Sequence, residues 1–344
     1  AVCPPGLESL CLKEMDRLDQ AFGDTRLLPG GVAFEGKLAT GYLANLHLGS
    51  PSRILMRLAE FKAFHFSDFE KQIRAVDWEL FLPPGPDLKI RVSCKKSKLF
   101  HSQALAQRSQ TIIESRLGPP GPDGGGCQTL MIRGENNRFI LSLDMSGDLL
   151  HRRGVKTKII SAPLRETLAF ALLQKIGYTG QEVLVDPMCG SGTFSLEAAM
   201  IKAGIPPGFF RRFAFENWPG FRPSSFHYMK NKAAQHFRFP LEPEIHASDI
   251  DPDAIQACRL NASFNEYLKA IQPRIANFFD LRVKDLAPQK GVVLLNPPYG
   301  KRLYKGMDTA GFFHEIGKKF CGGFRGWRMG IICLHDKAWK ALGL

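Results

Sequence analysis

The order of elements between residues 182 and 201 constrains the fold more than any other feature of this sequence. The segment Glu182–Val185 is short, and its three apolar residues include two β-branched valines, so it predicts a buried strand. Residues 194–201 have the apolar spacing of a helix. A turn of eight residues joins the two segments. Strand, glycine turn and helix in this order are typical of a nucleotide-binding loop in an open sheet. The sequence therefore predicts the α/β class, with a Rossmann-like domain.

The turn has the groups needed to bind the methionine end of S-adenosylmethionine. Gly190 and Gly192 allow the backbone to approach a ligand, and the helix N-terminus that follows favours a carboxylate. Asp186 can accept hydrogen bonds from an ammonium group. A dinucleotide fingerprint would need glycine or alanine where this chain has Ser195, and no Gly-Lys-Ser/Thr of a Walker loop follows. The candidate cofactor-binding residues of the turn are Asp186, Pro187, Met188, Cys189, Gly190, Ser191, Gly192 and Thr193.

Two later acids complete the expected cofactor site. Asp249 is expected to end a short strand, the second of the half-sheet, and to bind ribose hydroxyls, whereas Asp251 is expected to cap the next helix. An acid in the ribose role usually comes about 20 residues after the glycine turn, so residues 204–243 are expected to form an insertion. Asp280 is expected to end the third strand and to accept from the adenine amino group, with Asp285 as the alternative.

The tetrapeptide Asn296, Pro297, Pro298 and Tyr299 follows another apolar run, residues 291–295, which predicts a buried strand. It suits methyl transfer to the exocyclic amino group of a nucleobase. The Asn296 side-chain oxygen and the Pro297 carbonyl can each accept one N–H of the amine, which directs the nitrogen lone pair towards a methyl donor. Pro297 and Pro298 restrict the backbone, and the Tyr299 ring can stack on the base. These four residues are the catalytic candidates.

Taken together, these motifs resemble those of the THUMP-domain guanine-N2 RNA methyltransferases, most of all the bacterial enzymes that act on 23S ribosomal RNA. The resemblance rests on Asp186–Thr193, Ser248–Asp251 and Asn296–Leu303, in this order. Weaker matches upstream extend it over nearly the whole chain, at Cys3–Glu8, Gly30–Gly36, His151–Gly154 and Ala162–Ala169. The resemblance implies a class I enzyme that uses S-adenosylmethionine to methylate a guanine amine in structured RNA.

The resemblance also implies three domains: a ferredoxin-like segment over residues 1–65, a THUMP domain over 66–150 and a methyltransferase domain over 151–344. Basic residues of the second domain are expected to contact RNA phosphates, with a solvated run of charge as the alternative. They are Lys95, Lys96, Lys98, Arg108 and Arg116. A complete methyltransferase sheet has two strands after the fifth, and we expect them to be absent from a chain that ends at Leu344.

Composition agrees with a polyanionic partner. The 344 residues include 46 Lys and Arg against 33 Asp and Glu, and a net charge of +13 is typical of RNA-binding proteins but also of merely basic surfaces. Eight cysteines without a C-x-x-C pair or a metal-ligand cluster indicate reduced thiols of a cytoplasmic protein that has no metal site. No apolar run of about 18 residues occurs, so no membrane span is expected. The sequence does not specify an oligomeric state.

Three alternatives stay open at this stage. A transfer-RNA guanine-N2 methyltransferase would share all of these motifs. An amino-directed DNA methyltransferase acting on adenine N6 or cytosine N4 would share the Asn-Pro-Pro-Tyr loop, because the same chemistry serves any exocyclic amine. A catalytically silent RNA-binding protein is the third alternative, and the intact glycines and acids argue against it. The basic segment that precedes the catalytic domain favours RNA over DNA.

Overall fold

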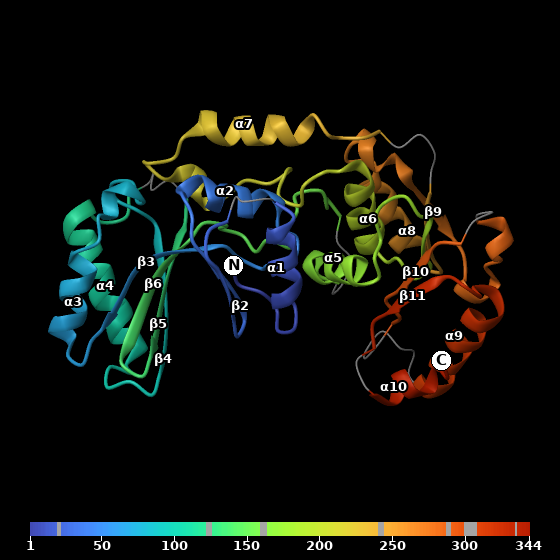
Figure 1. Ribbon diagram of the computed structural model, residues 1–344, viewed down its shortest axis with the longest axis horizontal. Coiled ribbons are helices and arrows are strands. Elements are labelled where there is room, and N and C mark those ends of the chain that lie inside the picture. Colours follow the sequence, from blue (N-terminus) through green and yellow to red (C-terminus); the bar gives the residue numbers. More distant parts are fainter. Residues whose placement is uncertain are drawn as a thin grey trace. The chain divides into compact units, whose positions relative to one another are not determined.

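The computed structural model describes residues 1–18, 22–121, 126–158, 164–239, 244–286, 290–298, 308–333 and 336–344. The chain divides into two compact units, each with its own main β-sheet (Figure 1). Unit 1 comprises Ala1–Leu150 and Gly208–Lys232, and unit 2 comprises His151–Pro207 and Ala233–Leu344.

Unit 2 contains a five-stranded sheet in the order β11-β10-β7-β8-β9, with every neighbouring pair parallel. The strands are β7 (Leu184–Asp186), β8 (Ile245–Asp249), β9 (Ile271–Ile275), β10 (Val292–Leu295) and β11 (Arg328–Ile331). All residues of β7 and β10 are buried, as expected for parallel strands covered on both faces. The chain runs from β7 through β8 to β9 and then returns to β10 on the other side of β7. The predicted Rossmann-like sheet is therefore confirmed, with its strand order reversed between β7 and β10.

Helices connect the strands of unit 2, and local sequence explains where they begin. The Asp251 side chain accepts a hydrogen bond from the Asp253 amide, and Pro252 occupies the first turn of α8, so the predicted cap is confirmed. The helices are α5 (Glu166–Lys175), α6 (Thr193–Ala203), α8 (Pro252–Ala262), α9 (Thr309–Gly323) and α10 (Asp336–Ala341). Among the described residues, no helix is both long enough and apolar enough to cross a membrane.

The third strand differs from the expectation. Asp280 does not end it, because β9 ends at Ile275 and Asp280 closes a 3₁₀ turn that follows. The Asn277 side chain accepts a hydrogen bond from the Phe279 amide and so favours a turn at the apolar pair that suggested a strand. The strand itself contains Pro273, which lacks a backbone donor and is tolerated because β9 is an edge strand.

Unit 1 contains a four-stranded sheet in the order β3-β6-β5-β4 and a separate hairpin, β1-β2. Its strands are β1 (Thr25–Leu28), β2 (Gly31–Phe34), β3 (Leu55–Lys62), β4 (Leu88–Lys95), β5 (Gln128–Glu135) and β6 (Arg138–Asp144). Its helices are α1 (Glu8–Asp16), α2 (Leu38–His47), α3 (Phe66–Arg74) and α4 (Ser102–Leu117). Helices α3 and α4 pack against one face of the four-stranded sheet (Figure 1).

Strand β5 was not predicted from the sequence. It forms a two-residue hairpin with β6, and the turn residues Asn136 and Asn137 have φ angles of 51° and 61°. Positive φ at both central positions is the type I′ geometry that matches the twist of a hairpin, and asparagine adopts it more readily than most residues. The Asn-Asn pair is thus the sequence signal for this hairpin.

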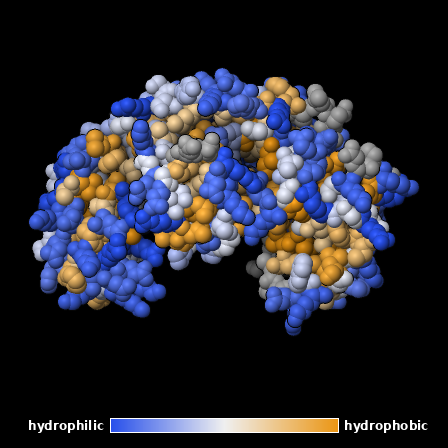
Figure 2. Space-filling view, in the orientation of Figure 1, coloured by the Kyte–Doolittle hydropathy of each residue, from blue (hydrophilic) through white to orange (hydrophobic). Residues whose placement is uncertain are grey.

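The insertion expected over residues 204–243 lies largely in unit 1, since Gly208–Lys232 packs there. Several of its aromatic side chains are buried in a cluster around Tyr42 of α2, whose ring stacks on Phe215 with centroids 4.4 Å apart. Phe226, in α7 (Pro223–Ala234), packs edge-on against Phe215 at 5.2 Å. These rings serve the core of unit 1. The outer face of α7 is mostly hydrophilic in the space-filling view (Figure 2).

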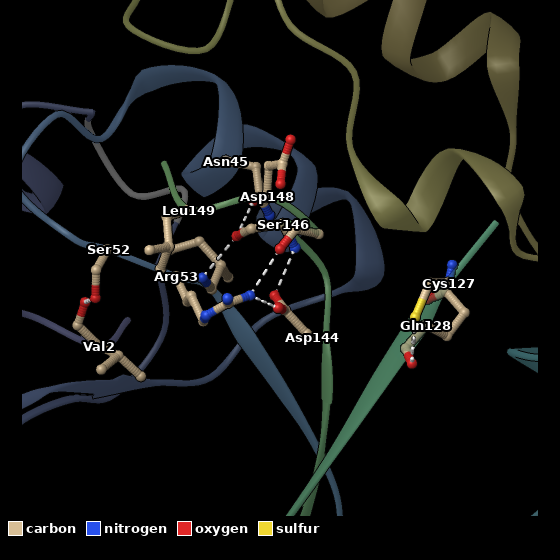
Figure 3. Close-up of polar contacts among 12 residues, drawn as sticks. Val2, Asn45, Ser52, Arg53, Cys127, Gln128, Asp144, Ser146, Asp148 and Leu149 are labelled. Atoms are coloured by element: carbon tan, nitrogen blue, oxygen red, sulfur yellow. Dashed lines mark hydrogen bonds and ion pairs between the residues drawn. The ribbon is translucent and has the colours of Figure 1, made fainter. Parts of the chain in front are cut away.

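A buried polar cluster joins α2, the start of β3 and the end of β6 (Figure 3). Arg53 forms an ion pair with Asp144, and the two side chains are 13% and 0% exposed. The second oxygen of Asp144 accepts from the Ser146 amide at 2.9 Å, and the Ser146 hydroxyl donates to the Asn45 side chain at 2.7 Å. Every charged group of the cluster therefore has a partner, which is the condition for burying a charge at acceptable cost.

We expect Asp144→Ala to lower the free energy of unfolding by about 3 kcal/mol, because it would leave Arg53 as a buried charge without a carboxylate. Asp24→Ala is the control. Its pair with Arg26 is 53% and 70% exposed, and exposed pairs contribute at most about 1 kcal/mol. Urea unfolding followed by circular dichroism measures both, and equal losses in the two variants would contradict the assigned role of the buried pair.

Candidate functional site

The two loops singled out in the sequence lie at neighbouring strand ends. Strands β7 and β10 are parallel, and Val185 pairs with Val293. Asp186 comes one residue after Val185, and Asn296 comes three residues after Val293. Because paired strands lie about 4.8 Å apart, both loops leave the same edge of the sheet side by side. This edge is the point where the strand order reverses, which is where open α/β sheets bind ligands.

The glycine turn adopts a conformation that other residues would not tolerate. Gly190 and Gly192 have φ angles of 53° and 86°. A Cβ atom on Gly192 would also lie 2.7 Å from the Cys258 sulfur, so both the backbone angle and the close packing require glycine. The Cys258 thiol and burial together raise the pKa of the Cys189 thiol, so Cys189 stays protonated and packs in the turn. Six of the eight turn residues are buried, and Met188 and Gly190 are half-buried.

Asp186 is fully buried, and only one of its two oxygens has a partner. Oδ2 accepts from the Ser195 amide at 3.2 Å and from the Ser195 hydroxyl at 2.7 Å. Oδ1 is shielded from solvent and makes no hydrogen bond to the described part of the chain. Burial raises the pKa of this carboxyl to about 7, although the bonds from Ser195 act in the opposite direction. A buried acceptor of this kind fits an ammonium group.

Three more buried polar atoms at the same strand ends make no hydrogen bond to the described part of the chain. They are the hydroxyl oxygens of Ser191 and Ser248 and the side-chain oxygen of Asn296. Buried polar groups almost always make hydrogen bonds in folded proteins. With Asp186 Oδ1, four such atoms lie at one edge of the sheet, where a polar ligand could supply their missing hydrogen bonds. The residues present therefore fit the S-adenosylmethionine expected from the sequence.

The catalytic candidates occupy the end of β10. Asn296 is half-buried and directs an inaccessible oxygen inward, Pro297 is buried and Pro298 is half-buried. Tyr299 lies outside the described residues. No group of three or more His, Cys, Asp or Glu side chains suited to a metal ion occurs within the described ranges.

Asp249 has a structural partner that the sequence did not suggest. Its Oδ2 accepts from the Gly190 amide at 2.9 Å, and its Oδ1 accepts from the Asp251 amide at 3.1 Å. The carboxylate thus holds the glycine turn from β8, and each oxygen keeps a second lone pair for a ribose hydroxyl. Asp280 is exposed in its 3₁₀ turn beyond β9.

Sequence reasoning missed two exposed apolar side chains beside Asp249. Ile250 follows β8 and is 59% exposed, and Ile275, which pairs with Asp249 at the end of β9, is 56% exposed. Large apolar side chains exposed at the ligand edge of a sheet suit a flat apolar ring. The adenine of the expected cofactor is such a ring.

Two further contacts hold the glycine turn from the segment that leads into unit 2. The Lys156 amino group donates to the Thr193 hydroxyl at 2.6 Å and forms an ion pair with Glu166 at 2.8 Å. Arg153 forms a buried ion pair with Glu197 of α6 at 3.0 Å. These pairs fix the first turns of α6 on the residues that precede it. Lys156 was not predicted, because only the fold brings it to a residue 37 positions away.

Asn261 of α8 is a second positioning residue that sequence reasoning missed. It is fully buried, its side-chain oxygen accepts from the amides of Thr157 and Lys158, and its amide nitrogen donates to the Ser191 carbonyl at 3.0 Å. One side chain therefore ties the glycine turn to the segment leading into unit 2. An asparagine inside a helix gives no sequence signal of its own for such a role.

The predicted RNA-binding residues fall into two groups in unit 1. Lys95, Lys96 and Lys98 lie at and beyond the end of β4, and the Lys98 amino group is 5.5 Å from the centre of the Phe64 ring. The other two residues lie on α4 and already have acid partners. Arg108 is paired with Glu70, and Arg116 is paired with Asp77 and Glu79.

Comparison with known proteins places both units among methyltransferases. Residues 153–342 match the family UPF0020, described as an RMKL-like methyltransferase domain, and residues 1–55 match the RlmL ferredoxin-like domain. A Synechocystis protein provisionally named as an RNA methyltransferase is 34% identical over 98% of this chain and 89% of its own length. The ribosomal RNA large subunit methyltransferase K/L of Cellvibrio japonicus is 31% identical over 100% of this chain, which spans 48% of that protein. The chain thus spans about half the length of the K/L relatives it matches.

A solved structure supports the same grouping. The crystal structure of SMU.472, provisionally described as a methyltransferase and complexed with SAH, has a TM-score of 0.87 and 28% sequence identity to this protein. The similarity covers 100% of this chain and 91% of that one.

The raised pKa of Asp186 predicts a pH-dependent stability for the ligand-free protein. The carboxyl ionises near pH 4 in the unfolded chain but near pH 7 in the folded protein, against an ordinary value of 3.8. Between these values the folded state keeps a proton that the unfolded state has lost, so the free energy of unfolding falls as the pH rises.

We therefore expect Asp186→Asn to gain thermal stability relative to the unsubstituted protein as the pH is raised from 5 to 8, because asparagine has no proton to lose. Differential scanning fluorimetry without ligand measures the difference between the two proteins at each pH. Melting temperatures that run parallel over this range would show that burial does not hold the proton on Asp186.

Proposed function

The chain belongs to the UPF0020 family of RMKL-like methyltransferase domains, and on that premise we propose that it methylates the exocyclic N2 amine of a guanine in structured RNA, with 23S ribosomal RNA as the substrate. The observation that carries the proposal is the buried oxygen of Asn296 at the end of β10, beside the loop that bears Asp186 Oδ1. Neither atom makes a hydrogen bond to the described part of the chain. One atom is an acceptor for an amine, and the other is an acceptor for the ammonium group of the methyl donor.

S-adenosylmethionine is the methyl donor, and it supplies an electrophilic methyl group when bound. Asp186 Oδ1 accepts from its ammonium group, and the start of α6 faces its carboxylate. Asp249 accepts from ribose hydroxyls through its remaining lone pairs, and Ile250 and Ile275 cover the adenine ring. Asp280 stays a candidate for the adenine amino group. The remaining turn residues, from Pro187 to Thr193, form the wall of the site.

Asn296 and Pro297 act on the target base. The lone pair of an exocyclic amine is delocalised into the base, so the nitrogen is a poor nucleophile. Acceptance of one N–H by the Asn296 oxygen and of the other by the Pro297 carbonyl favours a pyramidal nitrogen with its lone pair directed at the donor. Pro297 and Pro298 keep these acceptors in place, and Tyr299 stacks on the flipped guanine. Rate enhancement then comes from positioning more than from general-base catalysis.

The first part of the chain binds the RNA. Residues 1–65 form a ferredoxin-like segment, residues 66–150 form a THUMP domain and residues 151–344 form the methyltransferase domain, apart from Gly208–Lys232, which packs in unit 1. Lys95, Lys96 and Lys98 contact phosphates and contribute affinity rather than base selection. Arg108 and Arg116 contribute less, because their charges are already paired with acids. Work on ribosomal RNA is in keeping with a cytoplasmic enzyme.

Mass spectrometry of nucleosides tests the substrate directly. We expect deletion of the gene to remove one N2-methylguanosine from 23S ribosomal RNA, and we expect the purified protein with S-adenosylmethionine to restore it. A loss confined to transfer RNA, or of N6-methyladenine or N4-methylcytosine from DNA, would replace the proposed substrate. No change in any of these pools would favour a silent RNA-binding protein.

We expect Asn296→Ala to reduce kcat by roughly a hundredfold or more while the Kd for S-adenosylmethionine stays unchanged, because the side chain contacts the base and not the cofactor. Asn265→Ala is the matched control, since that asparagine caps the turn before β9, away from the ligand edge of the sheet. Isothermal titration and single-turnover assays separate the two quantities. Normal turnover in Asn296→Ala would refute its assigned role.

Asp249→Ala should weaken cofactor binding by roughly ten- to a hundredfold, because it removes a charged acceptor that also holds the Gly190 amide. Asp251→Ala is the control two residues away. It removes a helix cap and should cost about 1 kcal/mol of stability without changing the Kd. Isothermal titration calorimetry with S-adenosylmethionine measures the Kd of both variants. A weaker affinity in Asp251→Ala than in Asp249→Ala would exclude Asp249 from the site.

A further inference from the structure

One face of the four-stranded sheet in unit 1 is open to solvent. Residues two apart along a strand lie on the same face, and the pairing register carries this alternation from strand to strand. The row that begins at Arg91 in β4 continues through Met131 in β5 and Ser142 in β6 to Arg57 in β3. The opposite face holds buried residues such as Ile132 and Leu141, and α3 and α4 cover it.

The open face is strongly cationic. Within the four strands, its solvent-accessible charged side chains are seven exposed cations and two half-buried acids. The cations are Arg57, Lys62, Lys89, Arg91, Lys95, Arg133 and Arg138, and the acids are Glu60 and Glu135. A third acid on this face, Asp144, is fully buried and paired with Arg53. Such an excess on one flat surface attracts a polyanion.

Glu60 and Glu135 neutralise only some of the positive charge on this face. Glu60 pairs with Arg57 at 2.6 Å and also with Arg138, and Glu135 pairs with Arg133 at 3.0 Å. The other four cations form no ion pair with any residue that the structure describes. They are Lys62, Lys89, Arg91 and Lys95. Three of these four lie on one face of the edge strand β4, with Ser93 between Arg91 and Lys95, along about 20 Å of strand.

The uncharged residues of this face indicate what kind of nucleic acid it fits. They are Ser93, Thr129, Met131, Ile140 and Ser142, together with Leu55 at one end. None is aromatic, so the face has no ring on which an unpaired base could stack, as single-strand binders require. Lysine and arginine side chains on a flat sheet can instead reach the phosphates of a helix, which carry no sequence information.

We infer that the open face of this sheet docks the sugar-phosphate backbone of a double-helical RNA segment, with Lys89, Arg91 and Lys95 as the main phosphate contacts. The inference rests on the proposed function, because that function makes structured RNA the polyanionic partner. It extends the predicted set to Lys89 and Arg91, and it assigns the contact to the open face of the sheet rather than to α4. The helix side contributes less, because its Arg108 and Arg116 are held by acids.

The test uses the full chain and fluorescence anisotropy with a labelled RNA duplex and a single strand of equal length. The variant Lys89→Ala, Arg91→Ala, Lys95→Ala should lose affinity for the duplex at least tenfold. The slope of log K against log salt concentration should become shallower by about two to three, since each phosphate contact contributes close to one. The control variant Lys13→Ala, Lys71→Ala, Arg74→Ala removes the same charge from helices α1 and α3 and should change the affinity less than threefold.

Three outcomes would overturn the inference. Equal losses in both triple variants would show that net charge alone matters, and tighter binding of the single strand would show that bases are contacted. Failure of the unsubstituted protein to bind the duplex at low salt would exclude the surface altogether. The single variant Arg91→Gln, checked by circular dichroism, repeats the test if the triple variant unfolds. Calorimetry with S-adenosylmethionine reports on the proposed function separately, since the surface variant should bind it unchanged.

Discussion

Parallel pairing of β7 with β10 is the interaction on which the site depends. These strands are distant in sequence, yet their register fixes where both following loops leave the sheet. Since the strand order reverses between them, the connections that follow diverge and leave room for a ligand. Both strands are completely buried on both faces, so a slip of one residue would disturb the close packing on each side and is disfavoured. Core packing therefore sets the distance between Asp186, the proposed acceptor for the methyl donor, and Asn296, the proposed acceptor for the base.

The glycine turn is held rigidly, and this rigidity explains why some of its acceptors make no hydrogen bond to the described part of the chain. Asp249, Lys156 and Asn261 each bond to the turn from a different element, so it cannot relax to satisfy its own polar atoms. Asp186 consequently keeps one oxygen without a partner among the residues that the structure describes, and burial raises its pKa to about 7. Such local cost is typical of functional sites, where a ligand supplies the missing bonds. The same argument applies to Asn296 at the neighbouring strand end.

The sequence predicted those structural features that are determined by residues adjacent in the chain. The buried strand before Asp186 and the Asp251 cap both follow from a few adjacent side chains. The third strand was misplaced because β9 contains a proline on an edge, while the apolar pair after it forms a turn. Lys156 and Asn261 could not be predicted, because their contacts join residues that only the tertiary fold brings together. Net charge likewise could not show which basic side chains are already paired.

The division of charge in unit 1 limits where base selection can occur. Phosphate contacts on a sheet face without aromatic residues fix the position of an RNA helix but cannot tell one base from another. Under the proposed function, selection of guanine must then take place at the edge of the other sheet, where Asn296 and Pro297 are proposed to accept the amine. Those two acceptors alone suit the amine of adenine or cytosine equally well. The discrimination therefore rests on groups that contact the rest of the base, beyond the motif that performs the transfer.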